Sequence, residues 1–319
     1  MKTPSNHEVN VGKNSQQNLV SVVVPVYNEI ESLKEMHQKI CAAFQKTPYD
    51  LEIIFVDDGS RDGSYEIEQE LANGNSNTRV IRFPANRGKA AALNDGFAAA
   101  NGEFVATIDA DLQDDPDAIP QMIELIKKEK YDLVSGWKQN RQDRFIKKHT
   151  SKIFNFVTRI MTGIRLHDMN NGLKVYKSEV AKSINLYGEM HRFIPVLAKM
   201  NGFVSGEMKV RHFPRKYGET KYGTSRFYKG FLDLLTVLFT TKYLRRPMHF
   251  FGLWGMAFVS VGLIAEIYLL VLKYAFGEPF QRHIALLLLG VLLIVFGMQF
   301  FSLGLISEMI AYHQKTKKQ

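Results

Sequence analysis

The stretch Phe104-Val-Ala-Thr-Ile-Asp-Ala-Asp-Leu-Gln113 decides the fold of this chain. Its first half is apolar or β-branched, and its second half carries two aspartates and a glutamine. This is the pattern of a buried strand that ends in a polar turn. The same arrangement of a short apolar run followed by polar residues recurs on both sides, so the sequence predicts a sheet whose strands end in polar turns.

Apolar runs alternate with helical patterns over the first part of the chain. We expect strands at residues 19–26, 51–56, 79–83, 104–108 and 133–135, and helices at residues 29–47, 64–73, 89–100 and 119–130. This alternation predicts an α/β domain with a mostly parallel sheet and helices on both faces. Ligands of such sheets bind at the carboxyl ends of the strands.

Four polar clusters fall at those strand ends. They are Pro25-Val-Tyr-Asn-Glu29, Asp57-Asp-Gly-Ser60, Asn86-Arg-Gly-Lys89 and Asp109-Ala-Asp-Leu-Gln113. Tyr27 could line a base pocket, and Glu29 and a carboxylate of Asp57 or Asp58 could accept hydrogen bonds from a base or ribose. The two cations Arg87 and Lys89 suit phosphate. Each cluster alone could be a turn or a helix cap, but four at one sheet edge predict a binding site.

The cluster that begins at Asp109 contains candidate metal ligands. Asp109, Asp111 and Gln113 offer oxygen ligands, which Mg²⁺ and Mn²⁺ prefer, and such an ion would bridge a diphosphate and stabilise its departure. The alternative is a solvated acidic turn, because further aspartates follow. Neither a Gly-x-Gly-x-x-Gly nor a P-loop pattern follows a strand, which argues against dinucleotide oxidoreduction and P-loop hydrolysis.

Charge and composition restrict the partners. The chain has 319 residues and a formal net charge of +9, which calls for an anionic partner such as nucleic acid, a membrane surface or a phosphorylated substrate. Cys41 is the single cysteine, which excludes an internal disulfide and suits a reducing compartment, and we expect it to be buried. Residues 1–18 are polar and predict a disordered tail without a secretory signal.

Two apolar runs near the C-terminus predict a transmembrane hairpin over residues 247–310. Residues 250–272 contain one charge, Glu266, and residues 284–307 contain none, so each run reaches the roughly 20 residues that a spanning helix needs. A buried hairpin of a soluble protein is the alternative. The flanks carry more positive charge than the link, so we expect both termini in the cytosol, with amphipathic interfacial helices at 223–246 and a basic tail at 311–319.

The four clusters, in this order, resemble those of family 2 glycosyltransferases with the GT-A fold, a Rossmann-like sheet. Within that family the chain is most similar to the dolichyl-phosphate mannose synthase type, including bacterial polyprenyl-phosphate glycosyltransferases. The resemblance runs from about residue 19 to the end. It implies a cytosolic catalytic domain at 19–222 of an integral protein of the cytoplasmic (inner) membrane. The implied reaction is metal-dependent, inverting transfer of a hexose-type sugar from a UDP- or GDP-sugar to an undecaprenyl- or dolichyl-type polyprenyl phosphate.

The resemblance also implies roles for individual residues. The expected donor contacts are Pro25, Tyr27, Glu29, Asp57, Asp58, Lys89 and Asp109, together with Arg215 and Lys221 from a basic loop over the diphosphate. The expected contacts to the acceptor phosphate are Lys138, Arg141, Arg144, Lys148 and Ser151. The expected metal ligands are Asp109, Asp111 and Gln113, with Asp111, Asp168, Glu189 and His191 as candidate catalytic residues. Related enzymes often have Ser or Asp where this chain has Gly172. Whether a general base is used, and which residue it is, is therefore left open, because an acceptor phosphate is already anionic at neutral pH.

Other functions stay open at this point. A processive polysaccharide synthase would carry a Gln-x-x-Arg-Trp motif, which is missing, and more membrane spans. Transfer to a lipid without phosphate, such as diacylglycerol, fits the basic stretch at 138–148 less well. A non-catalytic membrane adaptor would be expected to lose Asp109 or Asp111. A nucleic-acid partner is not expected, since the basic residues do not accompany aromatic stacking platforms. Membrane lipids are expected partners, and a homo-oligomer is left open.

Overall fold

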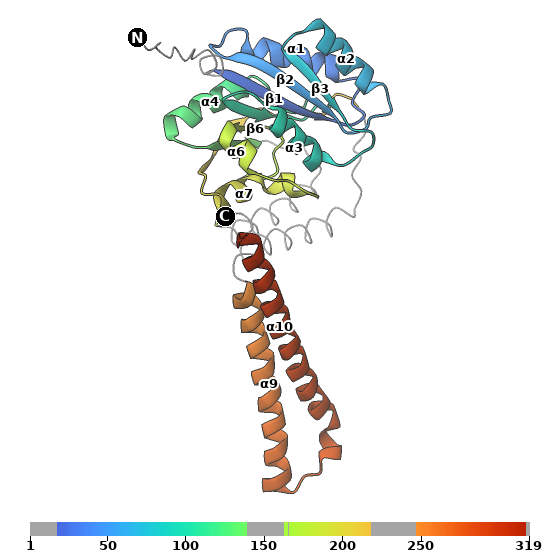
Figure 1. The fold of residues 1–319 in the computed structure, drawn as a ribbon, viewed down its shortest axis with the longest axis vertical. Coiled ribbons are helices and arrows are strands. Elements are labelled where there is room, and N and C mark those ends of the chain that lie inside the picture. The colour runs from blue at the N-terminus through green and yellow to red at the C-terminus, as the bar shows by residue number, and fades with distance from the viewer. Residues whose placement is uncertain (1–17, 139–162, 165, 218–246, 317–319) are drawn as a thin grey trace, which may run out of the picture. The chain divides into compact units, whose positions relative to one another are not determined.

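The computed structural model describes residues 18–138, 163–164, 166–217 and 247–316, with side chains to residue 313. The chain divides into two compact units, residues 1–233 and 234–319. The first holds the sheet and its helices, and the second holds a pair of long helices (Figure 1).

The first unit is built on one sheet of seven strands in the order β3-β2-β1-β4-β6-β5-β7. Four of these are parallel neighbours: β3 (Thr78–Arg82), β2 (Asp50–Asp57), β1 (Leu19–Val26) and β4 (Phe104–Thr107). β6 (Lys174–Lys177) runs antiparallel between β4 and β5 (Leu133–Lys138), and β7 (Ser205–Val210) pairs parallel with β5. The mostly parallel sheet with flanking helices that the sequence predicts is thus confirmed.

Alternate side chains of the central strands build a core on each face of the sheet. Val20, Val22 and Val24 of β1 belong to a buried cluster that includes residues of α1 (Leu33–Phe44) and α4 (Ala118–Glu129). On the other face α3 (Lys89–Ala99) lies so close to β1 that a Cβ at Gly96 would collide with the Val23 side chain. α2 (Ser64–Gly74) packs beside β2 and β3. Because the strands are covered on both faces, they are continuous apolar runs.

The structure differs from the sequence prediction at several boundaries. The first helix begins at Leu33 rather than at residue 29, because Asn28 has a φ of 52° and residues 30–32 form a turn. Beyond residue 135 the sequence predicted no further regular elements of the sheet domain. The structure has β6, α6 (Ser178–Ser183), the 3-10 helix η1 (Met190–Phe193), α7 (Ile194–Met200) and β7.

The second unit is a helical hairpin of α9 (Pro247–Phe276) and α10 (Ile284–Thr316), joined by a link that contains the 3-10 helix η3 (Phe280–His283). Both are long and apolar enough to cross a membrane, and only 17% and 11% of their most apolar windows is buried. That exposure is the opposite of what a core hairpin of a soluble protein requires. Residues 311–316, expected in a tail, continue α10 as helix.

Glycines bring the two helices of the hairpin together. A Cβ at Gly262 would lie 2.7 Å from the Gly290 carbonyl oxygen, and one at Gly255 would lie 2.8 Å from that of Gly297. Small residues at such positions let spanning helices pack backbone to backbone. Gly290 also makes room for the carboxyl group of Glu266, which the hairpin therefore holds against its own partner helix.

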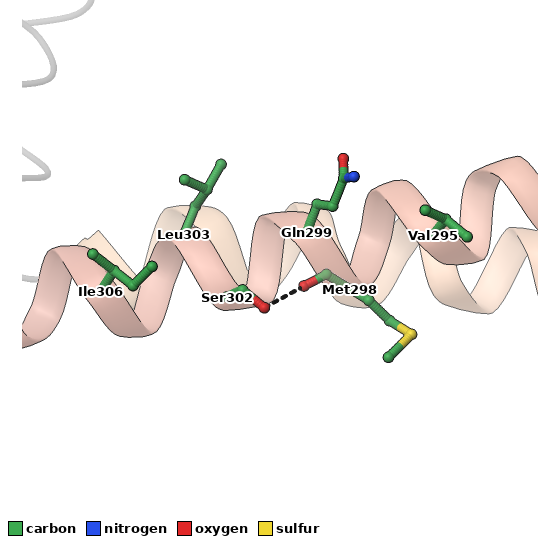
Figure 2. A pocket seen from close by; sticks show the side chains of 6 residues that line it. All are labelled: Val295, Met298, Gln299, Ser302, Leu303 and Ile306. Atoms are coloured by element: carbon green, nitrogen blue, oxygen red, sulfur yellow. Dashed lines mark hydrogen bonds between the residues drawn. The ribbon is translucent and has the colours of Figure 1, made fainter.

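The outer face of α10 carries an open, shallow groove with a volume of about 520 Å³. It is lined by Val295, Met298, Gln299, Ser302, Leu303 and Ile306 (Figure 2). The Ser302 hydroxyl donates to the Met298 carbonyl at 3.0 Å, so its polarity is met within the helix. All the lining residues come from one helix, so the groove is a feature of the hairpin surface and contains none of the polar clusters at the strand ends.

Candidate active site

The loops after β1 and β2 are tied together by side-chain hydrogen bonds. The backbone N–H of Asn28 donates to the Ser60 hydroxyl at 2.9 Å, and that of Glu29 donates to the Ser64 hydroxyl at 3.0 Å. In return the N–H of Arg61 donates to the Asn28 carbonyl oxygen of the side chain at 2.8 Å. These bonds fix the turn that follows Pro25 and hold half-exposed Tyr27 at the sheet edge.

Asp57 lies at the end of β2 and is fully buried. One carboxylate oxygen accepts the backbone N–H of Ser60 at 3.0 Å, and the other lies 3.7 Å from Nε of Arg82. The Arg82 guanidinium in turn stacks over the Tyr65 ring at 3.9 Å from its centroid. Asp57 is therefore oriented, with one oxygen turned toward a cation.

Asp58 has a different set of partners. Its carboxylate accepts the backbone N–H groups of Arg87 at 2.6 Å and Gly88 at 2.9 Å, which lie just before α3. Burial raises its pKa, although those N–H groups oppose the rise. The carboxylate thus joins the loop after β2 to the loop before α3. The donor-binding role of Asp58 stays a prediction, and in the structure its carboxylate holds these two loops together.

The segment after β7 returns to the same edge. Arg215 forms an ion pair with Glu29 at 2.5 Å, and its Nε donates to the Tyr217 carbonyl at 2.9 Å. The backbone N–H of Phe213 donates to the Gln113 carbonyl at 2.9 Å. Two predicted donor contacts, Glu29 and Arg215, therefore touch each other beside the Asp109–Gln113 turn. Lys221 lies outside the described residues.

Asp109 lies just after β4 and forms an ion pair with Lys89. The Lys89 ammonium, on the first residue of α3, contacts its Oδ1. Gly172 lies against the same carboxylate, since a Cβ there would be 2.5 Å from Oδ2. Burial opposes ionisation of Asp109, but Lys89, with smaller contributions from Lys138 and His191, outweighs it and lowers the pKa to about 2. Asp109 is a fixed anion, and a side chain at position 172 would displace it.

Asp111 is less well compensated. Its carboxylate accepts the N–H of Gln113 at 3.2 Å, across a turn in which Leu112 has a φ of 60°. Burial, then the negative charges of Asp109 and Asp114, raise its pKa to about 6, against smaller opposing effects of the Gln113 N–H and Arg215. None of the described lysine or arginine side chains forms an ion pair with Asp111. Among the described residues, the negative charges near this carboxyl group therefore outweigh the positive ones.

The residues present fit a divalent cation that is completed by its substrate. Within the described ranges no group of three or more His, Cys, Asp or Glu side chains is arranged to hold a metal alone. Asp109 and Asp111 supply two carboxylates, and Mg²⁺ is commonly bound by one or two carboxylates plus substrate phosphates. The electrostatic strain at Asp111 is what such an ion would relieve. Gln113 already uses its backbone carbonyl for Phe213 and His212.

Lys138 is the one predicted acceptor contact that the described residues include. At the end of β5 its ammonium lies 2.7 Å from a carboxylate oxygen of Asp114, and both side chains are nearly buried. It thus borders the acidic turn after β4. Arg141, Arg144, Lys148 and Ser151 lie outside the described residues.

The predicted candidates for a base have distinct surroundings. Asp168 is 4% exposed, and its backbone carbonyl accepts from the Ser135 hydroxyl. Glu189 forms an ion pair with Arg192 at 2.6 Å, which occupies its carboxylate. Burial, and then the positive charges of Lys89 and Arg192, lower the pKa of His191 well below its usual range, so its imidazole is neutral. His191 interacts electrostatically with Asp109, which places it at the site.

Sequence reasoning missed Lys174. It opens β6, is 3% exposed, and donates to the carbonyl of Asn171. Burial, and then the positive charge of Lys89, lower the pKa of Lys174 to about 8. The negative charges of Asp168, Asp109 and Asp114 act in the opposite direction and raise it. The signal in the sequence was a lysine inside the apolar run Leu173-Lys-Val-Tyr176. An ammonium in such a run is buried only where carboxylates compensate it.

The order of the strands is that of a GT-A-like fold, with carboxylates directly after β4. The model of the family "Glycosyl transferase family 2" matches residues 21–184. The chain belongs to this family. The expectation of a glycosyltransferase is thereby confirmed.

Named relatives align with nearly the whole chain. A dodecaprenyl-phosphate galacturonate synthase of Rhizobium johnstonii is 37% identical over 298 residues, which covers 92% of this chain and 87% of that protein. An undecaprenyl-phosphate 4-deoxy-4-formamido-L-arabinose transferase of Pseudomonas fluorescens is 35% identical and covers 91% of this chain and 83% of its own length. The two apolar helices and these relatives together identify the chain as a membrane protein.

Solved structures agree on the fold. The glucosyl-3-phosphoglycerate synthase of Mycobacterium tuberculosis, in a complex with Mn²⁺, UDP-glucose and glycerol 3-phosphate, matches with a TM-score of 0.51. The two are 20% identical, over 70% of this chain and 80% of that one. S. aureus TarS in complex with UDP-GlcNAc matches with a TM-score of 0.52 at 18% identity, over 70% and 67% of the two chains. Likeness at this identity shows the fold alone.

Proposed function

We propose that this chain transfers a hexose-type sugar from a nucleoside diphosphate sugar to polyprenyl phosphate at a membrane surface. The observation that carries the proposal is the pair Asp109 and Asp111. Lys89 pairs with Asp109, and no lysine or arginine of the described residues forms an ion pair with Asp111. The named relatives act on dodecaprenyl and undecaprenyl phosphate, and their alignment over more than nine-tenths of this chain supports the same class of acceptor.

The donor would bind across the carboxyl ends of β1, β2 and β4. In this proposal Pro25, Tyr27, Glu29 and Asp57 surround the base and ribose. The hydrogen bonds from Asn28 and Glu29 that join their loops support it. Arg215, which is paired with Glu29, would contact the diphosphate. UDP-sugars in the fold neighbours favour UDP as the first donor to test, with GDP as the alternative.

A divalent cation, Mg²⁺ or Mn²⁺, would be held by Asp109 and Asp111, with Gln113 as a further contact. Bound there, it would stabilise the charge that develops on the departing nucleoside diphosphate. Mn²⁺ in a fold neighbour supports a divalent ion of this kind. Arg215, Lys89 and Lys221 would add positive charge around the same leaving group.

The acceptor phosphate would attack the anomeric carbon from the face opposite the diphosphate. The new bond joins a phosphate oxygen to that carbon, the bond to the diphosphate breaks, and the configuration inverts. A phosphate oxygen is anionic at neutral pH, so no side chain has to remove a proton. Lys138, with the basic residues that follow it, would hold the phosphate. Asp168, Glu189 and neutral His191 would orient the sugar and acceptor rather than act as a strong base.

Membrane placement follows from the hairpin. We propose that residues 19–222 form the catalytic domain, that residues 223–246 lie at the interface, and that α9 and α10 span the cytoplasmic membrane with both termini in the cytosol. The charge of the flanking residues supports this orientation. A homo-oligomer is left as an open prediction.

The test is a transfer assay with the purified full-length protein. It would be incubated with polyprenyl phosphate, Mg²⁺ or Mn²⁺, and a panel of radiolabelled UDP- and GDP-sugars, and the lipid fraction would be counted. We expect one donor to label a lipid that releases its sugar in mild acid, as a sugar phosphodiester does. Label in the lipid fraction only when diacylglycerol replaces polyprenyl phosphate would contradict the acceptor. No labelled lipid with any donor, with Asp111→Ala behaving identically, would overturn the proposal.

A further inference from the structure

The contact between Lys89 and Asp109 has a consequence for how the site is filled. Lys89 is the first residue of α3, and Gly88 before it has a φ of 90° and no neighbouring atom within 4 Å of the place where a Cβ would stand. The two side chains of the ion pair are 30% and 35% exposed. The ammonium therefore reaches Asp109 from a partly open position and is not locked into the core.

An ammonium and a divalent cation would compete for the same oxygen. Lys89 lies on Oδ1 of Asp109, one of the two carboxylates that we assign to the metal. A metal ion that arrives alone must either displace a lysine already in contact or bind beside its positive charge. Both cost free energy, because like charges repel at short range where water is partly excluded.

A diphosphate would change this balance. Lys89 is the first residue of α3, an eleven-residue helix, so its side chain starts at the positive end of the helix dipole, where the Asp58 carboxylate already accepts the N–H of Gly88. An anion placed there attracts the ammonium away from Asp109, and the phosphate oxygens add ligands for the metal. The same movement frees one carboxylate oxygen and completes the coordination.

We propose that Lys89 is an exchangeable counter-ion that blocks the cation site until the donor diphosphate takes over its ammonium. This inference rests on the proposed function, in which a diphosphate and a divalent ion share this edge of the sheet. It makes metal binding conditional on the nucleotide. A permanent structural ion pair between Lys89 and Asp109 would predict no such dependence.

The chain offers a matched control for this ion pair. Lys177 of β6 lies 2.6 Å from a carboxylate oxygen of Asp132, with a side chain 37% exposed, so the chemistry and exposure resemble those of the Lys89 pair. Neither Lys177 nor Asp132 is among the residues that we assign to the site. Lys177→Gln therefore removes an equivalent ion pair while leaving the cation site untouched.

The experiment measures Mn²⁺ binding to the full-length protein in detergent by the loss of the free-ion signal in electron paramagnetic resonance. Wild type, Lys89→Gln, Lys89→Arg and Lys177→Gln are titrated with Mn²⁺ alone, with UDP, and separately with GDP. Without nucleotide, we expect Lys89→Gln to bind Mn²⁺ about tenfold more tightly than wild type. Lys89→Arg and Lys177→Gln should match wild type. With the nucleotide that binds, the advantage of Lys89→Gln should disappear.

Two outcomes would overturn the proposal. One is equal affinity of wild type and Lys89→Gln for Mn²⁺ alone, with both proteins showing the same unfolding temperature. The other is an absence of Mn²⁺ binding by every variant with either nucleotide. Mn²⁺ affinity is measured without sugar transfer. A negative result in the labelling assay would therefore count against the acceptor and leave the role of Lys89 to be decided by the Mn²⁺ titrations.

Discussion

Two acidic turns at the same edge of the sheet show how differently one residue type can be used. Asp57-Asp58 and Asp109-Ala-Asp111 end the strands β2 and β4, which flank β1. In the first turn, Asp58 is bonded to backbone N–H groups and Asp57 lies between Ser60 and Arg82. In the second, Asp109 pairs with Lys89, and Asp111 accepts the backbone N–H of Gln113 and forms no ion pair with a described lysine or arginine.

The difference teaches that placement at a strand end does not define a role. A carboxylate whose charge is met by fixed backbone donors stabilises its loop and has little left to offer a ligand. The Asp111 carboxyl group lies in the negative field of Asp109 and Asp114, so an added cation stabilises its ionised form most. The predictions below separate these two uses, from the largest expected effect to the smallest.

The largest effect is expected at Asp111. Asp111→Asn should lower the initial rate of sugar transfer about 100-fold or more, because one metal ligand and its charge are lost. Asp114→Asn is the matched control, since Asp114 is an aspartate three residues further along the chain that pairs with Lys138 and is not assigned to the metal. Rates would be measured in the labelling assay at saturating Mn²⁺. A rate for Asp111→Asn within threefold of wild type would place the metal elsewhere.

Asp58→Ala should lower the stability of the protein more than it changes the kinetics of sugar transfer. Loss of the bonds to Arg87 and Gly88 should cost about 2 kcal/mol of unfolding free energy. Differential scanning fluorimetry in detergent would show this as a lower unfolding temperature. Should the unfolding temperature stay unchanged while the donor KM rises tenfold, Asp58 would be a donor ligand and the contrast between the turns would be wrong.

A smaller effect is expected at the ion pair between Glu29 and Arg215. Glu29→Gln should raise the donor KM about tenfold with little change in kcat, because the carboxylate that orients Arg215 is lost. The double variant with Arg215→Gln should be no worse than Arg215→Gln alone. Additive losses in this double-mutant cycle would show that the two residues act independently.

The smallest effect concerns Glu68, a buried acid beneath the first turn. No described residue bonds its carboxyl oxygens, and burial, then the charge of Asp57, raise its pKa from 4.5 to about 9. The folded state therefore holds a proton that the unfolded chain has released above pH 4.5. The free energy of unfolding is therefore highest below the unfolded pKa of 4.5. It decreases as the pH rises from there to the folded pKa of about 9.

Glu68→Gln should remove that dependence. The variant should be more stable than wild type at neutral pH, by about 1 kcal/mol, and the gap should close toward pH 4. Unfolding temperatures measured from pH 4 to pH 9 would check this. A wild-type stability that rises across the same window would contradict the assignment of a protonated Glu68.

Much of the fold could be read from the sequence, for identifiable reasons. The continuous apolar run at residues 19–26 and the start of a helix at Lys89 are local patterns, and the structure has both. β6 was missed because a four-residue strand has little periodicity and is defined by non-local pairing with β4 and β5. The first helix was begun too early because the left-handed Asn28 is set by Ser60, 32 residues away.

The candidate site was predictable as a set of clusters but not as a set of roles. The positions of Asp57, Asp58, Asp109 and Asp111 at strand ends follow from hydrophobic patterning. The partners that distinguish them do not, since Arg87, Lys89 and Gly172 come from other loops. Lys174 was missed because its buried charge makes sense only once the acids around it are placed.

The most direct test of the account is whether Asp111 brings a divalent ion to a nucleotide diphosphate. Pulsed electron-nuclear double resonance on Mn²⁺ bound with UDP or GDP reports the phosphorus coupling of a directly coordinated phosphate. We predict this coupling in wild type and in Asp114→Asn, and its loss in Asp111→Asn. An unchanged phosphorus coupling in Asp111→Asn would contradict the central claim that the turn after β4 is the metal site.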